Sequence, residues 1–121
     1  MNIEIVENGN QNTAVVESDI NVIVDVQSAI DFIATIRYTT PCDSIIINKN
    51  SISEDFFDLK SGLAGEVLQK FINYKMSIAI VGDFSLYSSK SLRDFIYECN
   101  KGKHIYFAEN NEEAFKAFRS V

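Results

Sequence analysis

A serine at the start of a predicted helix is the residue of this sequence that most directly suggests chemistry. Ser61-Gly62-Leu63 opens a stretch in which residues 63, 67, 68, 71 and 72 are apolar and fall on one helical face. A hydroxyl there lies at the positive end of the helix dipole, which suits a phosphate, bound or covalently attached. The same serine also suits an ordinary helix cap that accepts from a free first-turn amide, with Gly62 allowing close packing. Both interpretations stay open on the residues alone.

A second group of polar residues follows the next apolar run. The loop from Gly82 to Lys90 leaves the end of one predicted strand, and Asn48 opens the loop after the preceding strand. Binding sites of parallel sheets gather beyond the carboxyl ends of the strands. The side chains that this placement could bring together in one crevice are Asp58, Lys60, Ser61, Asp83, Ser85 and Lys90. Phe84 is a further candidate in the same loop, and ordinary turn chemistry is the alternative.

Other reactive residue types carry no recognisable pattern. His104 is the only histidine, and it begins a predicted strand without an acid–base partner or metal-ligand spacing nearby. Cys42 and Cys99 are interpreted as packing thiols, because nothing near them in sequence would lower a thiol pKa. The chain has neither a dinucleotide fingerprint nor a Walker-type phosphate loop. The sequence therefore predicts no catalytic residue, no metal and no cofactor.

Composition excludes several classes of protein. The 121 residues are enough for one domain, 1–121, and a hydrophobic fraction of 46% is enough for a core. A formal net charge of −6 without a basic stripe argues against nucleic-acid partners. No apolar run approaches the roughly 20 residues of a membrane span, and no secretion signal is visible. We expect a cytoplasmic protein whose two cysteines are not bonded to each other.

Hydrophobic periodicity predicts five strands and four helices. The strands are expected at residues 3–6, 13–17, 44–48, 76–81 and 104–108. The polar connection after the first strand is longer than we expect for a two-residue turn. The helices are expected at 24–38, within 53–74, from Ser91 with a capping box to Asp94, and at 112–119. Gly62 and Gly65 favour a short turn near Phe56, a break at 58–61 and then the main second helix, with one continuous helix as the alternative.

This order predicts a single α/β domain. Three strand–helix–strand crossovers imply a mostly parallel five-stranded sheet with right-handed connections, and the N-terminal hairpin adds antiparallel strands at one edge. Three consecutive isoleucines, residues 45–47, fit a strand buried on both faces. We expect one helix-covered face.

The element order and the segment Asp58-Leu59-Lys60-Ser61-Gly62-Leu63 resemble the STAS domain, the fold of bacterial anti-sigma factor antagonists. That family carries an Asp-Ser-Ser-Gly-Leu motif, in which a partner kinase phosphorylates the second serine. The matching position is Ser61, although Asp58 lies one residue further from it and Lys60 replaces the first serine. Over nearly its full length, notably 57–71 and 82–102, the chain also resembles a bacterial family catalogued as domain of unknown function 4180, which implies no activity.

The STAS resemblance implies a small regulatory protein-interaction module of unspecified oligomeric state, switched by phosphorylation of Ser61 and binding an unidentified protein. The first alternative is a small-molecule or nucleotide-binding domain that uses the crevice. The second is a hydrolase with Ser61 or Ser85 as nucleophile, for which no base is recognisable. If Ser61 is a cap, we expect Ser61→Ala to destabilise the fold and Ser61→Asp to preserve its stability, because aspartate also caps helices.

Overall fold

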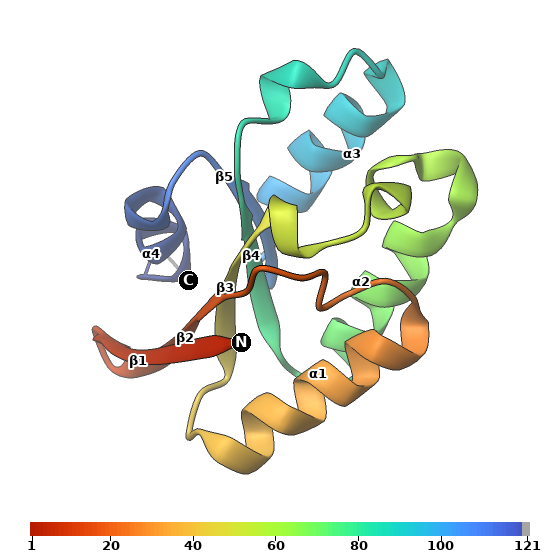
Figure 1. Ribbon diagram of the computed structural model, residues 1–121. Coiled ribbons are helices and arrows are strands. Elements are labelled where there is room, and N and C mark those ends of the chain that lie inside the picture. The colour runs from red at the N-terminus through yellow and green to blue at the C-terminus, as the bar shows by residue number, and fades with distance from the viewer. Residues whose placement is uncertain (120–121) are drawn as a thin grey trace.

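The computed structural model describes residues 1–119, which form one sheet with helices packed on both faces (Figure 1). The strands are β1 (Asn2–Asn8), β2 (Gln11–Glu17), β3 (Ser44–Asn48), β4 (Ser77–Val81) and β5 (Ile105–Ala108). The α-helices are α1 (Val26–Thr39), α2 (Leu63–Asn73), α3 (Lys90–Asn100) and α4 (Asn111–Arg119). Short 3-10 segments follow β3 and β4: η1 (Lys49–Ser51), η2 (Glu54–Phe57), η3 (Leu59–Ser61) and η4 (Phe84–Leu86).

The five strands lie side by side in chain order, β1-β2-β3-β4-β5. β1 and β2 pair as an antiparallel hairpin, whereas β2–β3, β3–β4 and β4–β5 are parallel pairs. The prediction of five strands, four helices and an N-terminal hairpin is confirmed. The sheet as a whole is mixed, because the hairpin contributes one antiparallel pair.

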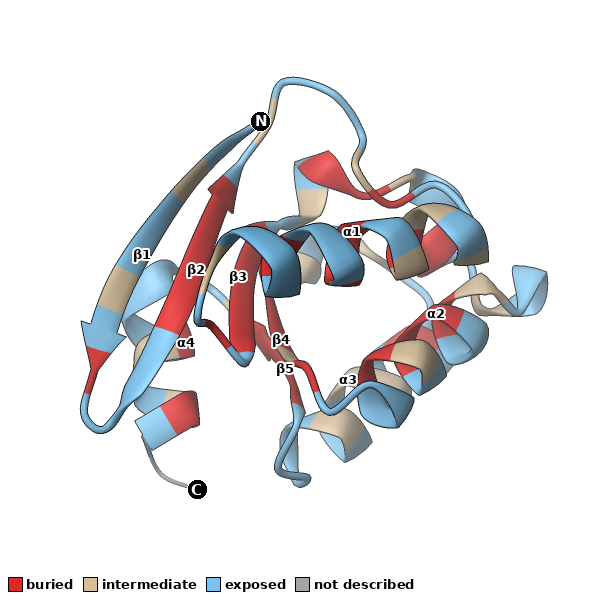
Figure 2. Ribbon diagram, turned by 90° about the horizontal axis from the view of Figure 1, so that it is seen from below, coloured by how far each residue is buried: buried red, intermediate tan, exposed pale blue. Residues whose placement is uncertain are grey.

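The central strand β3 is buried on both faces, as its isoleucine run predicts. Ile45 and Ile47 belong to the larger core, between the sheet and α1–α3, whereas Ile46 belongs to the smaller core under α4. All three are at most 1% exposed. Figure 2 shows how burial varies across the sheet: β2–β5 are largely buried, whereas β1 is largely exposed.

Helices cover both faces of the sheet, so the expectation of a single covered face is wrong. Figure 1 shows α1, α2 and α3 on one side and α4 on the other. The right-handed crossover rule acts on helices that join parallel strands, as α1, α2 and α3 do, and among residues 1–119 α4 joins no two strands. It is therefore free to cover the second apolar face, where Ala114 and Phe118 pack with Tyr106.

The hairpin turn is shorter than expected. Asn8 pairs with Gln11, which leaves only Gly9 and Asn10 as the loop. Gly9 has φ +66°, and a positive φ at the first loop position is the geometry that glycine adopts at little steric cost in tight hairpins.

The start of α3 also differs from the expected capping box. The helix begins at Lys90, and its cap is Ser89, whose Oγ accepts from the Leu92 amide at 3.1 Å. Ser91 already lies inside the helix and so cannot be its cap, and the Asp94 carboxylate binds the Lys90 ammonium at 2.7 Å. The predicted break before α2 is confirmed, since η2 and η3 precede a helix that starts at Leu63.

Candidate functional site

The edge at which β2–β5 end, here called the carboxyl edge, carries the irregular segments of the chain. η1 follows β3 directly, η4 follows β4, and η2 and η3 lead into α2 (Figure 1). The connection from β2 to α1 is fastened to the same edge. The Val22 amide donates to the Ser51 carbonyl at 2.7 Å, and the Ser53 amide donates to the Ile23 carbonyl at 2.9 Å.

Ser61 is exposed on this edge and makes three hydrogen bonds within its own turn. Its hydroxyl is shared between the carbonyl oxygens of Asp55 at 2.7 Å and Asp58 at 2.8 Å. Its oxygen also accepts from the Leu63 amide at 3.2 Å. Ser61 therefore ties η2, η3 and the start of α2 together, and it acts as donor as well as acceptor.

Asp58, Lys60 and Gly62, which together with Ser61 are here called the Ser61 group, belong to the same turn. The Asp58 carboxylate accepts from the Lys60 amide at 3.2 Å and so begins η3. Gly62 ends η3 and precedes α2 with φ +77°, a left-handed conformation that glycine adopts at little cost. The formal cap position of α2 is thus Gly62, and Ser61 supports the helix from one residue earlier.

We expect Ser61→Ala to lower the free energy of unfolding by about 0.5–2 kcal/mol, through loss of the bond to Leu63. The structure reverses the expectation for Ser61→Asp. A carboxylate has no hydrogen to donate and would lie against the Asp55 and Asp58 carbonyl oxygens, so we expect Asp to be no more stable than Ala. Urea unfolding of both variants checks this order, and a Ser61→Asp protein as stable as wild type would contradict it.

The loop after β4 forms a second polar group. The Asp83 carboxylate accepts from both the amide and the hydroxyl of Ser85, and these bonds, the hydroxyl first, hold the Asp83 pKa below its ordinary value. A smaller contribution comes from the ammonium of Lys49. Lys90 lies apart from this group, because it starts α3 and binds Asp94.

Sequence patterns missed three side chains that join η1, η2 and η4. The Tyr87 hydroxyl donates to the carboxylate of Glu54, 3.2 and 3.3 Å from its two oxygens. The Lys49 ammonium lies 5.2 Å from the centre of the Tyr87 ring, within cation–π range. These partners are far apart in the chain and follow no motif, so only the fold brings them together.

Aromatic side chains fill the space between the loops that leave β3 and β4. The Phe57 ring is 5.3 Å from the Tyr87 ring and 6.0 Å from the Phe84 ring, measured between centroids. Phe84 in turn meets Phe107 of β5 edge-on at 5.3 Å. Phe56 and Phe57 are buried, whereas Phe84 and Tyr87 are half-buried.

The Lys49 side chain fills the space directly over Gly82. A Cβ added at Gly82 would lie 2.5 Å from the Lys49 Cδ, so only glycine leaves room for the lysine stem. The expected crevice is consequently occupied by the protein's own side chains. Among residues 1–119, no hydrogen bond or ion pair joins the Ser61 group to Asp83, Ser85 or Lys90.

Tyr87 provides a pH-dependent marker of this edge. Burial, followed by the nearby Glu54 carboxylate, raises its pKa from 10.0 to about 12. Because the pKa is higher in the folded protein, the un-ionised Tyr87 contributes to the stability of the fold. That contribution is complete below pH 10, the ordinary tyrosine pKa, and is lost as the pH rises through about 12. We expect an absorbance titration to show Tyr87 ionising late and Tyr87→Phe to lack that step. Burial also raises the Tyr106 pKa, so Tyr106→Phe is the control that identifies the other late tyrosine.

The arrangement offers little for hydrolysis. The lowered pKa of Asp83 makes it a weak base for Ser85, and the Ser61 hydroxyl faces carbonyl oxygens. His104 lies at the opposite edge, where its Nδ1 is 3.4 Å from the Ser77 hydroxyl. Burial raises the Cys99 pKa to about 11, and both cysteines are free thiols. Within residues 1–119, no three potential metal-ligating side chains gather in one place.

Comparison with known proteins places most of the chain in one family. Residues 8–118 match the family model described as Domain of unknown function (DUF4180). No curated protein and no solved structure match the chain. Across residues 1–119, every helix falls short of the length and apolar character required to cross a bilayer.

Proposed function

The chain belongs to the DUF4180 family, and from the geometry of its carboxyl edge we propose that it is a STAS-like regulatory protein-interaction module of the bacterial cytoplasm. Its partner is another protein, which contacts the segments η1–η4. Ser61 is the residue at which a phosphate alters that contact.

The observation that carries this proposal is the filled carboxyl edge. Small molecules bind in concave pockets, whereas here Phe57, Phe84 and Tyr87 pack together and Lys49 lies over Gly82. A cavity of about 820 Å³ lies at the opposite edge of the sheet and a smaller one lies beside the end of β5, and neither is lined by Lys49, Ser61 or Asp83. A part of the edge that the protein's own side chains fill favours a protein partner over a nucleotide or metabolite there.

Exposed apolar side chains on the same edge support an interaction surface. Leu86 of η4 is 75% exposed, and Ile20, in the connection from β2 to α1, is 74% exposed. Charged groups of both signs, Glu54, Asp83 and Lys49, lie in the neighbouring segments. Apolar anchors with a polar surround are the usual composition of protein interfaces.

The hydrogen bonds of Ser61 give the switch a physical basis. A phosphate would add a charge of about −1.5 to −2 and would remove the hydroxyl donor. The bonds to the Asp55 and Asp58 carbonyls would be lost, while the amides at the start of α2 favour a phosphate on that side. Because η2 also carries Phe57 and Glu54, a rearranged η2 would change the aromatic cluster and the Tyr87 contact.

Two binding measurements test the proposal against its alternatives. A thermal-shift screen tests nucleotides and common metabolites on wild type and on Gly82→Ala, in which the added methyl group should displace the Lys49 side chain. We expect no compound to raise the unfolding midpoint of wild type in a way that Gly82→Ala changes. A pull-down with wild type, Ser61→Ala and Ser61→Asp should retain the partner with Ala and lose it with Asp. A partner that binds both variants equally would remove the switch, and a nucleotide shift that Gly82→Ala abolishes would favour the small-molecule alternative.

A further inference from the structure

We propose that the chain has a second site, at the opposite edge of the sheet, which binds a small organic anion with an apolar body. A cavity of about 820 Å³ opens where β3, β4 and β5 begin, here called the amino edge. That volume lies within the range of roughly 300–1,000 Å³ typical of small-molecule sites. No part of the proposed interaction surface contributes to it.

The cavity combines apolar and cationic walls. Phe71, Met76 and Phe118 are buried core side chains that form part of its lining, and Ile72 is 44% exposed there. Lys75 and Lys103 line the same cavity, and neither ammonium has an ion-pair partner among residues 1–119. An apolar body with one negative group matches these two kinds of lining.

The balance of charge decides the sign of the ligand. The formal charges of the lining are those of Lys75, Lys103 and Arg37 against that of Asp43, which gives +3 − 1 = +2 with His104 neutral. The last turns of α1 and α2 also end here, and each contributes about half a negative charge. A local balance of roughly +1 remains in a chain whose net charge is −6. This balance favours a monoanion over a cation.

Lys75 occupies a backbone position that glycine would fill at lower energy. It follows α2 with φ 57°, and it is the only described residue other than glycine with a positive φ. The Met76 amide donates to the Phe71 carbonyl and the Lys75 amide donates to the Ile72 carbonyl, which together form a Schellman motif. Glycine is the usual residue at this position, so a strained lysine whose side chain lines a cavity points to a role for that side chain.

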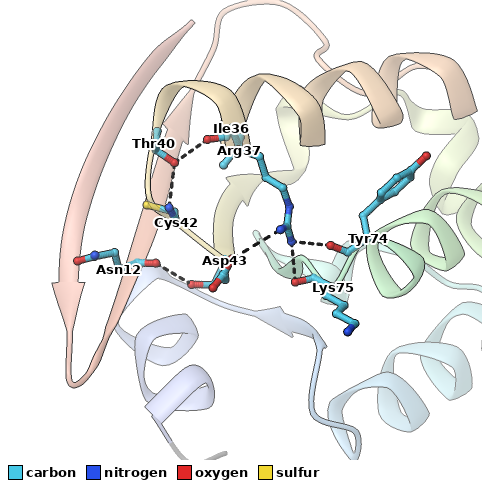
Figure 3. Close-up of polar contacts among 9 residues, drawn as sticks. Asn12, Ile36, Arg37, Thr40, Cys42, Asp43, Tyr74 and Lys75 are labelled. Carbon is cyan, nitrogen blue, oxygen red and sulfur yellow. Dashed lines mark hydrogen bonds and ion pairs between the residues drawn. The ribbon is translucent and has the colours of Figure 1, made fainter.

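Arg37 holds the mouth of the cavity in place. From α1, its guanidinium donates to the carbonyls of Tyr74 and Lys75, the latter at 2.9 Å, and it lies 3.9 Å from Asp43 (Figure 3). These bonds satisfy carbonyls at the end of α2 that would otherwise repel an anion. Arg37 is thus a positioning residue, and Lys75 and Lys103 are the groups left for the ligand.

The test uses 8-anilinonaphthalene-1-sulfonate, an aromatic monoanion whose fluorescence rises in apolar sites. We expect saturable binding of one probe per chain, weakened about fivefold by Lys75→Gly and similarly by Lys103→Gln, as expected for loss of one charge near the surface. Lys75→Gly should at the same time raise the unfolding midpoint by roughly 3 °C, because it relieves the backbone strain. Weaker binding by a more stable protein separates a ligand role from damage to the fold.

Lys116→Gln is the matched control, because that lysine pairs with glutamates on α4 and does not line the cavity. It should bind the probe as wild type does. The neutral N-phenyl-1-naphthylamine has a similar apolar body without the sulfonate and should bind more weakly, with no response to Lys75→Gly. The inference is overturned if wild type shows no saturable binding, if Lys75→Gly binds the anion as tightly as wild type, or if the neutral probe binds equally well.

Discussion

Phe57→Ala is expected to lower the free energy of unfolding by about 3–5 kcal/mol, the usual effect of removing a buried aromatic ring. Phe57 is 4% exposed and contacts the rings of Phe56, Phe84 and Tyr87. Its removal should leave a cavity between η2 and η4, within the aromatic cluster that fills this part of the edge. Urea unfolding measures the loss, and the late ionisation of Tyr87 should move toward ordinary values in the same variant.

Tyr97→Ala is the matched control for Phe57→Ala. Tyr97 is 64% exposed on α3, so its truncation should change stability by no more than about 0.5 kcal/mol. A loss below about 1 kcal/mol for Phe57→Ala would contradict the packed cluster, and with it the view that the carboxyl edge is closed to small molecules.

Asn100→Ala is expected to lower the free energy of unfolding by about 1–3 kcal/mol, because it leaves a buried backbone group without its partner. The Asn100 side chain makes hydrogen bonds to the backbone at the outer edge of β5, in the place where a neighbouring strand would bond. The Phe107 amide donates to its side-chain oxygen at 2.8 Å, and its side-chain nitrogen donates to the Phe107 carbonyl at 3.2 Å. Its loss would also expose part of that edge to pairing with another chain.

Urea unfolding and light scattering at rising protein concentration measure these two effects of Asn100→Ala. Asn73→Ala is the control, because that side chain is exposed and accepts a hydrogen bond from the equally exposed Gln69 side chain. It should remain near wild type in both measurements. Unchanged stability and unchanged scattering in Asn100→Ala would contradict this prediction. They would show that the asparagine does not keep other strands from pairing with the edge of β5.

Local patterns predicted the elements of this fold because each depends on neighbouring residues. The isoleucine run gave the doubly buried strand β3, and the glycines at 62 and 65 placed the break before α2. The side of the sheet that α4 covers was not predictable in this way, because α4 is not one of the helices that join two of the five strands among residues 1–119. The cap of α3 was assigned to Ser91 and lies at Ser89, since two serines in one turn offer the same local signal.

The candidate site was predictable in part. Ser61 lies beside the Leu63 amide, as expected, but its hydroxyl bonds to Asp55 and Asp58 depend on the path of η2 and η3, which no periodic pattern describes. Asp83 and Ser85 do meet, because they are two residues apart. The contact of Tyr87 with Glu54 spans 33 residues and required the fold to be known.

The central claim, that the carboxyl edge is a protein-interaction surface, is tested most directly by photocrosslinking from single positions. A photoreactive phenylalanine analogue replaces Leu86 on η4 or, as control, Tyr38 at the far end of α1; these side chains are 75% and 93% exposed. In extracts of the source cells, we expect Leu86 to form one specific protein adduct that phosphoserine at position 61 abolishes, and Tyr38 to form none. An adduct pattern that is the same from both positions, or that phosphoserine leaves unchanged, would contradict the account.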